Sequence, residues 1–170
     1  MALSQSQYSS ARLGVDVKRG LKTKAENGWY PAMAPAGYTH KPWQNLSKIV
    51  ALKDPKRFGL VKKAIHLVIA GESPGSVLDK LNNKWGFKTK KMGKLGGKPL
   101  SRSNWYRILS DTFYYGEYEY PKGSGNWYKG KQEPMITKEE YDIIQQHLGK
   151  HGNRRPQRRK FAFTGLIRCK

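Results

Sequence analysis

The polar residues between positions 101 and 107 carry the chemistry that stands out most in this chain. The stretch SRSNWYR places two guanidinium groups, a carboxamide and two serine hydroxyls close together. These groups make the hydrogen bonds by which proteins contact phosphates and the edges of bases. They form a candidate nucleic-acid-binding set made of Ser101, Arg102, Ser103, Asn104 and Arg107.

The same stretch has the pattern of a short amphipathic helix. Ser101 stands where an N-cap hydroxyl accepts from the first free backbone N–H groups. Trp105, Ile108 and Leu109 fall on one face, and the polar side chains fall on the other. We predict that the apolar face packs inward and that the polar face enters a DNA groove. The alternative is an ordinary amphipathic surface helix with solvated charges.

The sequence contains no recognisable catalytic constellation. Its serines do not occur in GxSxG or SxxK motifs or in a Ser/His/Asp arrangement. No glycine-rich stretch matches a phosphate-binding loop, and residues 96–98 belong only to a basic loop. The histidines lack the spacing of metal ligands; they are His40, His66, His147 and His151. We therefore predict binding without catalysis, and no metal or cofactor site, in these residues.

The charge balance indicates a polyanionic partner. Lys and Arg number 33 against 12 Asp and Glu, which gives a net charge of +21 and a pI near 10.1. A folded chain of this size repels itself at that charge, so nucleic acid is the leading partner. An anionic membrane surface is the weaker alternative, since no basic amphipathic helix has the Trp/Phe/Leu face of that mode.

Other classes are excluded by composition. The mean hydropathy is −0.79, and no apolar run approaches the ~18 residues of a membrane span. The first ten residues lack the apolar core of a secretory signal, so we predict an intracellular protein. The chain has one cysteine, Cys169, which cannot form a disulfide within the chain, so a disulfide-stabilised secreted fold is excluded.

Three helices are predicted in the middle of the chain. Asp-Pro at residues 54–55 and Ser-Pro at residues 73–74 are helix starts, because Asp and Ser cap while Pro suits the first helical position. Gly71 and Gly86 end these two helices, and the Ser101 helix is the third. A tight turn and then a longer loop join the three, as in a helix-turn-helix core with an extended second connection.

Flanking elements are predicted on both sides of this core. Leu13, Val17 and Leu21 recur in a helix over residues 8–25 that stops at Asn27 and Gly28. A hairpin is expected with strands near residues 37–39 and 48–53, closed by residues 41–47. The fold class predicted is α+β, mainly helical, with a helix-turn-helix-like three-helix core, a β-hairpin wing and small flanking strands.

The C-terminal third supplies the wing and a last helix. Residues 112–120 alternate aromatic with small or charged residues and are expected to pair with residues 126–129, with Gly116 at a bulge or a close backbone approach. Thr137 and Glu140 form a capping box for a helix that runs to about Gly149. The basic residues 151–160 are expected to be disordered without a partner.

The loop over residues 87–100 is expected to be flexible and basic. It has five lysines and three glycines, and no acidic residue occurs between Asp79 and Asp111. A solvated charged face is one interpretation. Because the loop lies beside the candidate groove helix, we favour phosphate contacts, made by Lys88, Lys90, Lys91, Lys94 and Lys98.

The order of these segments resembles the Recombinase domain of large serine recombinases, the serine integrases of phages and mobile elements. The similarity covers residues 14–169 and rests on order and spacing. Its segments are VKRGLKTKAENGWYP, APAGY, the helix opened by DP, LNNKWGFKT, SRSNWYRILSDTFYYGEY, PMITKEEYDIIQQHL and FTGLIRC.

The resemblance implies a middle module of a longer recombinase. It divides the chain into residues 1–27, the end of an inter-domain helix; 28–149, the DNA-binding domain; and 150–170, a basic linker and the start of a zinc ribbon. Cys169 would be the first ligand of that ribbon, orphaned here because the CxxC partners are absent, so zinc is expected only in the full-length parent. The catalytic domain with its serine is likewise absent, so we expect a fragment. We expect this fragment to be monomeric in isolation. Its parent is expected to act in the bacterial cytoplasm, at the nucleoid.

The function implied is sequence-specific binding of double-stranded DNA at one arm of an attachment site. Arg102, Ser103, Asn104 and Arg107 would read the major groove, and the lysines of residues 88–98 would add nonspecific affinity. Backbone or minor-groove contacts are expected from Lys18, Arg19 and Lys22 at one end and from Arg154, Arg155, Arg158 and Arg159 at the other.

Two other functions remain open from the residues alone. An RNA-binding, ribosome-associated module would use aromatic side chains as a stacking surface. Its candidate platform is Tyr114, Tyr118, Tyr120 and Trp127. A protein-interaction domain is the third class, and a charge of +21 disfavours it.

Overall fold

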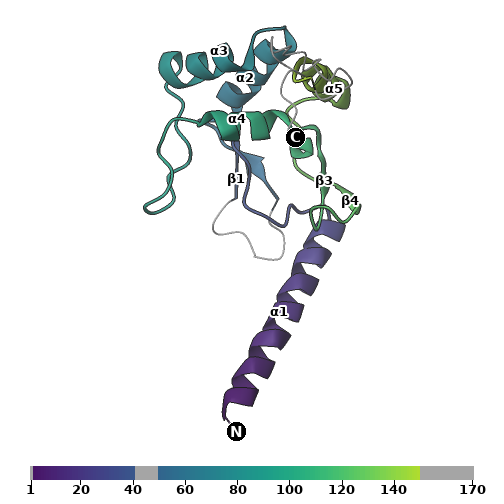
Figure 1. The fold of residues 1–170 in the computed structure, drawn as a ribbon. Coiled ribbons are helices and arrows are strands. Elements are labelled where there is room, and N and C mark those ends of the chain that lie inside the picture. The colour runs from purple at the N-terminus through teal and green to yellow at the C-terminus, as the bar shows by residue number, and fades with distance from the viewer. Residues whose placement is uncertain (1, 41–49, 150–170) are drawn as a thin grey trace, which may run out of the picture.

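A computed structural model describes residues 2–40 and 50–149 of the chain. A cluster of helices lies at one end, two small strand pairs lie beside and below it, and one long helix extends away (Figure 1). In chain order the elements are α1 (Ala2–Glu26), β1 (Tyr38–Thr39), β2 (Leu52–Lys53), α2 (Phe58–Ile69), α3 (Pro74–Asp79), the π-helical turn η1 (Lys80–Lys84), α4 (Arg102–Leu109), the 3₁₀ turn η2 (Thr112–Tyr115), β3 (Glu117–Glu119), β4 (Trp127–Lys129) and α5 (Lys138–His147).

The helix starts of the core follow local capping chemistry. The Ser73 hydroxyl accepts from the backbone N–H of Ser76 at the start of α3, as predicted. The predicted start of α2 was three residues early. Residues 54–57 form a turn in which the Asp54 carboxylate accepts from the backbone N–H of Lys56, and regular helix begins at Phe58. Asp54 therefore closes the preceding turn instead of capping the helix.

The three-helix core is confirmed. Trp105 of α4 is 0% exposed and its indole Nε1 donates to the carbonyl oxygen of Pro74, 2.9 Å away, which joins α4 to the start of α3. Val61 and Ile65 of α2 and Leu81 of η1 are buried in the same core. Burying large apolar side chains stabilises such a core by about 1.5–3 kcal/mol each.

The two strand pairs are short and antiparallel. In the first, Tyr38 pairs with Lys53, within the predicted segments; the predicted connection over residues 41–47 lies outside the described residues. In the second, Tyr118 pairs with Tyr128, which confirms the hairpin after the third helix. The fold class is α+β and mainly helical.

The start of this second hairpin differs from the prediction. Residues 112–115 form η2 and not the beginning of a strand, because the Asp111 carboxylate accepts from the N–H of Phe113 and caps the turn. Phe113 and Tyr114 are both buried, a pattern that strand alternation does not allow on one covered face. Gly116 is therefore not at a bulge. It ends η2 in the left-handed region, at φ 104°.

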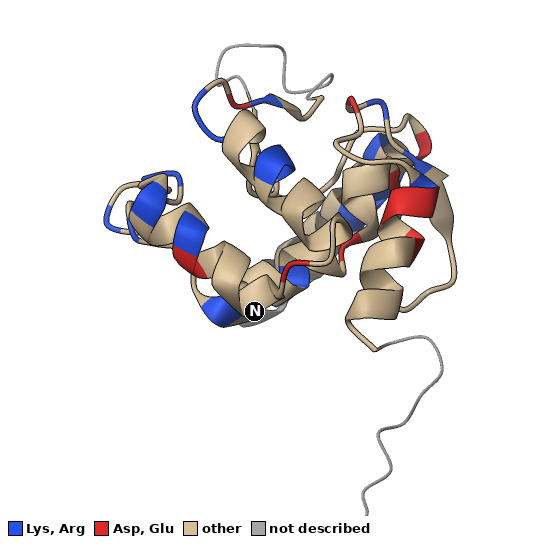
Figure 2. Ribbon diagram, turned by 90° about the horizontal axis from the view of Figure 1, so that it is seen from above, with Lys and Arg blue, Asp and Glu red and all other residues tan. Residues whose placement is uncertain are grey.

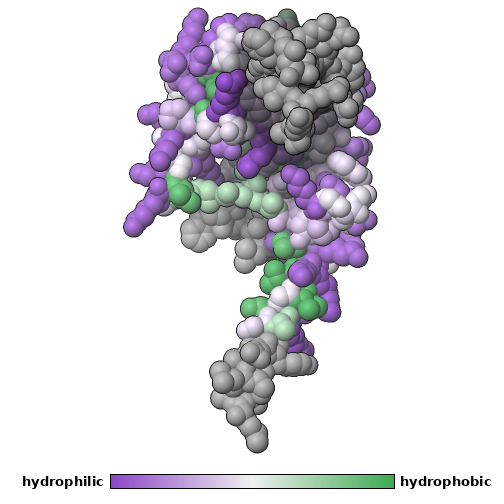
Figure 3. Space-filling view, viewed as in Figure 1, coloured by the Kyte–Doolittle hydropathy of each residue, from purple (hydrophilic) through white to green (hydrophobic). Residues whose placement is uncertain are grey.

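The long helix α1 is joined to the rest of the chain near its C-terminal end. Ala25 is buried, and its carbonyl oxygen accepts from the Tyr118 hydroxyl at 3.3 Å. Gly28 then takes φ 75° and ends the helix as predicted. Leu13 and Val17, two members of the predicted apolar stripe, are 65% and 51% exposed. Leu21, the third member, lies closer to the body and is half-buried. Green hydrophobic atoms mark the exposed part of α1 in Figure 3.

The last helix packs across α2 and α4. Thr137 and Glu140 form the predicted capping box at its start. Ile144 is buried, and the side-chain amide of Gln145 donates to the carbonyl oxygen of Leu109 at 2.8 Å. This bond holds the C-terminal end of α4 against α5.

Candidate nucleic-acid interface

Helix α4 has the two faces that the sequence predicts. Its apolar side chains Trp105, Ile108 and Leu109 are buried. The opposite face looks away from α3, and on it the four predicted polar residues are exposed: Arg102, Ser103, Asn104 and Arg107. The Ser101 hydroxyl accepts from the N–H of Asn104 at 3.4 Å, as expected of the cap.

The two arginines of α4 have distinct surroundings. The Arg102 guanidinium lies over the ring of Tyr106, 5.7 Å from its centre, which orients it along the helix. The Arg107 guanidinium lies near Asp111. Burial raises the pKa of that carboxyl; the hydrogen bond from the Phe113 N–H and the positive charges of Lys122 and Arg107 oppose the rise. Both arginines are exposed, so they are available to an anionic partner.

The segment before α4 is an ordered hairpin, which corrects the prediction of a flexible loop. We call residues 87–100 the basic hairpin. Met92 and Leu95 exchange two backbone hydrogen bonds of 2.8 and 2.9 Å across its tip, and the N–H of Thr89 donates to the carbonyl oxygen of Lys98 at 2.9 Å. Gly96 has φ 79°, and a Cβ there would overlap the carbonyl oxygen of Lys90. Glycine is therefore required for the strands of the hairpin to approach.

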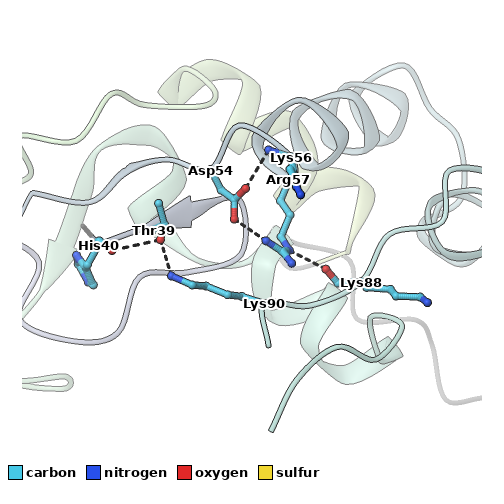
Figure 4. Close-up of polar contacts among 7 residues, drawn as sticks. All are labelled: Thr39, His40, Asp54, Lys56, Arg57, Lys88 and Lys90. Carbon is cyan, nitrogen blue, oxygen red and sulfur yellow. Dashed lines mark hydrogen bonds and ion pairs between the residues drawn. The ribbon is translucent and has the colours of Figure 1, made fainter. Parts of the chain in front are cut away.

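Figure 4 shows how one strand of the basic hairpin is held on the body. The Arg57 Nε donates to the carbonyl oxygen of Lys88, and its Nη1 pairs with the Asp54 carboxylate, both at 2.7 Å. The Lys90 ammonium donates to the Thr39 hydroxyl at 2.5 Å. The start of the hairpin is thus joined to the turn before α2 and to β1.

The side chain of Asn82 holds the other end of the basic hairpin. Asn82 of η1 accepts from the N–H of Leu100 and donates to its carbonyl oxygen, each at 2.9 Å. Leu100 is itself buried. Since α4 begins two residues later, this amide clamp fixes both the hairpin and the N-terminus of α4.

Positive charge is concentrated on this side of the molecule. Residues 80–110 contain nine Lys or Arg and no acidic residue. Acidic positions are most prominent around α5 in Figure 2, on the opposite side from the helix and loop that carry the blue positions of this segment. The predicted phosphate contacts of the basic hairpin are all exposed; they are Lys88, Lys90, Lys91, Lys94 and Lys98.

The predicted basic residues of α1 lie on a separate element. Arg19 pairs with Asp16 and Lys22 with Glu26, each at 3.9 Å on the same helix. Lys18 is exposed on α1 as well. In Figure 1, α1 and the basic hairpin extend to the same side of the helical cluster. The predicted contacts at Arg154, Arg155, Arg158 and Arg159, together with Cys169, lie outside the described residues.

The aromatic platform of the RNA-binding alternative is not formed. Tyr114 and Tyr118 are buried, and their hydroxyls donate to the carbonyl oxygens of Ala36 and Ala25. Trp127 is 56% exposed and Tyr120 is half-buried, so two of the four rings are enclosed in the core. Bases cannot stack on rings that other side chains cover.

A sequence model of the Recombinase family matches residues 55–151, which include α2, α4, the basic hairpin and α5. The chain belongs to the Recombinase family. The family match thereby confirms the resemblance found in the sequence, and it covers more than half of the chain. Among curated proteins, the comparison found no match.

Two solved structures share the fold of this Recombinase-family chain. One is described as the crystal structure of an LSR–DNA complex; it has 17% identity and a TM-score of 0.56, with 78% of this chain and 37% of that chain covered. The other concerns the sequence requirements of the Listeria innocua prophage attP site; it has 17% identity and a TM-score of 0.54, with 76% and 49% covered. The chain thus spans less than half the length of either.

Sequence reasoning missed the residues that position this Recombinase-family surface. Arg57 and Asn82 contact the basic hairpin from 31 and 18 residues away. The spacing of Asp54 and Arg57 is a sequence signal for their ion pair, because residues three apart near a helix start face each other. Nothing in the sequence indicates that Asn82 binds the backbone of Leu100.

Two classes of site are not found in the described residues. Among residues 2–40 and 50–149, no three His, Cys, Asp or Glu side chains come together in a way that would hold a metal ion. Nor does any helix in these residues combine the length and apolar character needed to cross a bilayer.

Proposed function

We propose that this chain binds double-stranded DNA in a sequence-specific way, with the N-terminal part of α4 in the major groove. The observation that carries the proposal is the exposed row of Arg102, Ser103, Asn104 and Arg107 on a helix whose opposite face is fully buried. A helix held in this way presents hydrogen-bonding groups at fixed positions. Such pre-positioning is what reading of base edges requires.

The two kinds of basic side chain would make different contacts with DNA. An arginine that makes two hydrogen bonds to guanine provides ~1–3 kcal/mol of discrimination against another base. Arg102 and Arg107 are the candidates for this role. The lysines of the basic hairpin continue the same surface and would bind phosphates, which gives affinity without sequence preference.

Family membership supports a role in DNA recombination. Both structures of similar fold are named for DNA, one as a complex with DNA and the other for an attP site. We propose that the DNA bound here is one arm of an attachment site, and that strand exchange is done by a catalytic domain elsewhere in the recombinase. Zinc binding through Cys169 and contacts with other recombinase subunits belong to the same proposal.

The proposal is tested by selecting bound duplexes from a random pool and footprinting the protein on the selected duplex. The selected duplex then competes against random duplex and single-stranded RNA at two salt concentrations. We expect a preference of about 10³-fold or more for the selected duplex, as for specific DNA-binding proteins. Recovery of no common sequence, or equal competition by RNA, would contradict the proposal.

A further inference from the structure

The tip of the basic hairpin carries two exposed apolar side chains. Met92 and Leu95 are 51% and 77% exposed. They face each other across the turn that closes the hairpin, where their backbones exchange two hydrogen bonds. Single apolar residues on a surface are common, but here two lie together at the end of a projecting element.

The hairpin is built to hold this tip away from the body. Its first strand is anchored by Arg57, and its second strand ends at the Asn82 clamp on Leu100. The tip itself projects from the helical cluster (Figure 1). An element that is fixed at both ends of its base and exposed at its end can insert into a partner without refolding.

The charge around the tip selects the kind of partner. Lysines at positions 88, 90, 91, 94 and 98 flank the two apolar residues in the sequence, and the hairpin contains no acidic residue. A positively charged element with an apolar end matches DNA grooves, where phosphates flank stacked bases. Methionine and leucine are among the side chains that enter base steps from the minor groove.

The position of the hairpin selects the groove. Only residues 99–101 separate its last lysine from the first turn of α4. When the N-terminal part of α4 lies in the major groove, the segment immediately before it crosses the adjacent phosphate backbone. The next groove that it reaches is the minor groove.

We infer that the basic hairpin inserts Met92 and Leu95 into the minor groove beside the α4 site and bends the duplex there. This inference rests on the proposed function, since it requires the same bound DNA. It adds a second kind of specificity, because steps that unstack easily would be favoured at positions that α4 does not touch.

The test measures DNA bending with the full chain and the selected duplex. Fluorescence energy transfer between dyes at the two duplex ends reports the bend, and binding is measured on the same samples. The test variant is the double substitution Met92→Ser and Leu95→Ser. Met33→Ser is the matched control, because Met33 is 69% exposed and lies outside the hairpin.

We expect the native chain and the control to bend the duplex by tens of degrees, in the ~20–90° range of wedge-inserting proteins. The double variant should bind within a few-fold of the native affinity and lose most of the bend. An unchanged bend in the double variant, or a straight duplex with the native chain, would overturn the inference while sequence-specific binding stands. Failure of the native chain to prefer any duplex would instead overturn the proposed function.

A lipid surface is the competing partner for a basic element with an apolar tip. Flotation with vesicles of phosphatidylglycerol and phosphatidylcholine tests it with the same variants. We expect any vesicle binding to be unaffected by the serine substitutions. Vesicle binding that is lost in the double variant, together with an unchanged DNA bend, would overturn the inference.

Discussion

At the scale of single residues, two kinds of side chain make up the proposed DNA-binding surface: those proposed to contact bases, and those that hold its backbone in place. Arg107 is exposed on the outer face of α4. Arg57 and Asn82 instead contact the backbone of the basic hairpin. Sequence patterns find the first kind, because helical period places polar residues on one face. They do not find the second kind, because those contacts depend on how distant segments pack.

Replacing a proposed base contact and a proposed phosphate contact should have different effects. We expect Arg107→Ala to reduce discrimination by ~1–3 kcal/mol at one or two base positions. Lys98→Ala should weaken binding to all duplexes alike and lower the salt slope by ~1. Titration of single-base variants of the selected duplex, at several salt concentrations, separates the two patterns. A uniform loss in Arg107→Ala would contradict its assignment as a base contact.

The ion pair between Asp54 and Arg57 should make stability depend on pH. Burial acts to raise the pKa of Asp54, but hydrogen bonds from the Arg57 side chain and the Lys56 backbone outweigh it, and the pKa lies below its usual value. The folded state therefore holds the proton more weakly than the unfolded state. The stabilisation is complete above the unfolded pKa of ~3.9 and disappears as the pH falls through the lower folded value.

Asp54→Asn tests this contribution. The charge-assisted bond to Arg57 is lost, so we expect a loss of ~1–3 kcal/mol at neutral pH. Urea unfolding of both proteins from neutral pH down to about pH 3 measures the difference, which should shrink at the acid end. Asp79→Asn is the control, because Asp79 is exposed on α3. A difference that is the same at every pH would show that the charge is not responsible.

At the scale of elements, local chemistry decided which predictions succeeded. The starts at Ser73, Ser101 and Thr137 were predicted correctly because a cap depends on residues within one turn. The 3₁₀ turn at residues 112–115 was missed because the aromatic alternation favoured a strand, although Asp111 caps the turn locally. The burial of both Phe113 and Tyr114, which excludes that strand, depends on distant partners. The basic hairpin was predicted to be a flexible loop, because composition cannot show that Arg57 and Asn82 hold its base.

Two glycines in the basic hairpin make a matched pair for testing its geometry. Gly93 and Gly96 both have positive φ, at 57° and 79°. A Cβ on Gly93 meets no atom within 4 Å, whereas one on Gly96 overlaps the Lys90 carbonyl oxygen. Gly93→Ala should lose only the ~1–2 kcal/mol of a left-handed alanine. Gly96→Ala should also separate the hairpin strands.

Amide hydrogen exchange measures this separation. The N–H groups of Met92 and Leu95 are hydrogen-bonded across the tip. We expect Gly96→Ala to speed their exchange much more than Gly93→Ala does. Equal protection in the two variants would show that the close approach at Gly96 is not needed for the hairpin.

At the scale of the whole molecule, acidic and basic residues lie on different sides. Seven of the twelve acidic residues follow residue 110, whereas residues 80–110 carry only positive charge. The acidic side around α5 would be repelled by a duplex, and the side with α4 and the basic hairpin would be attracted (Figure 2). Electrostatic steering would therefore favour approach in the orientation that places α4 against the DNA.

The net charge should make salt act in opposite directions on folding and on binding. A chain with a charge of +21 repels itself, so screening should stabilise the fold as NaCl rises from about 0.05 M to about 0.5 M. We expect a gain of about 1 kcal/mol, seen as a rise of a few degrees in the thermal unfolding midpoint. The same change should lower affinity for the selected duplex by at least tenfold, because salt opposes the release of counterions.

The double variant Lys94→Gln and Lys98→Gln should show both effects more weakly. An unfolding midpoint that falls with salt would mean that attractive ion pairs outweigh the repulsion, and the excess charge would then need no polyanion to explain it.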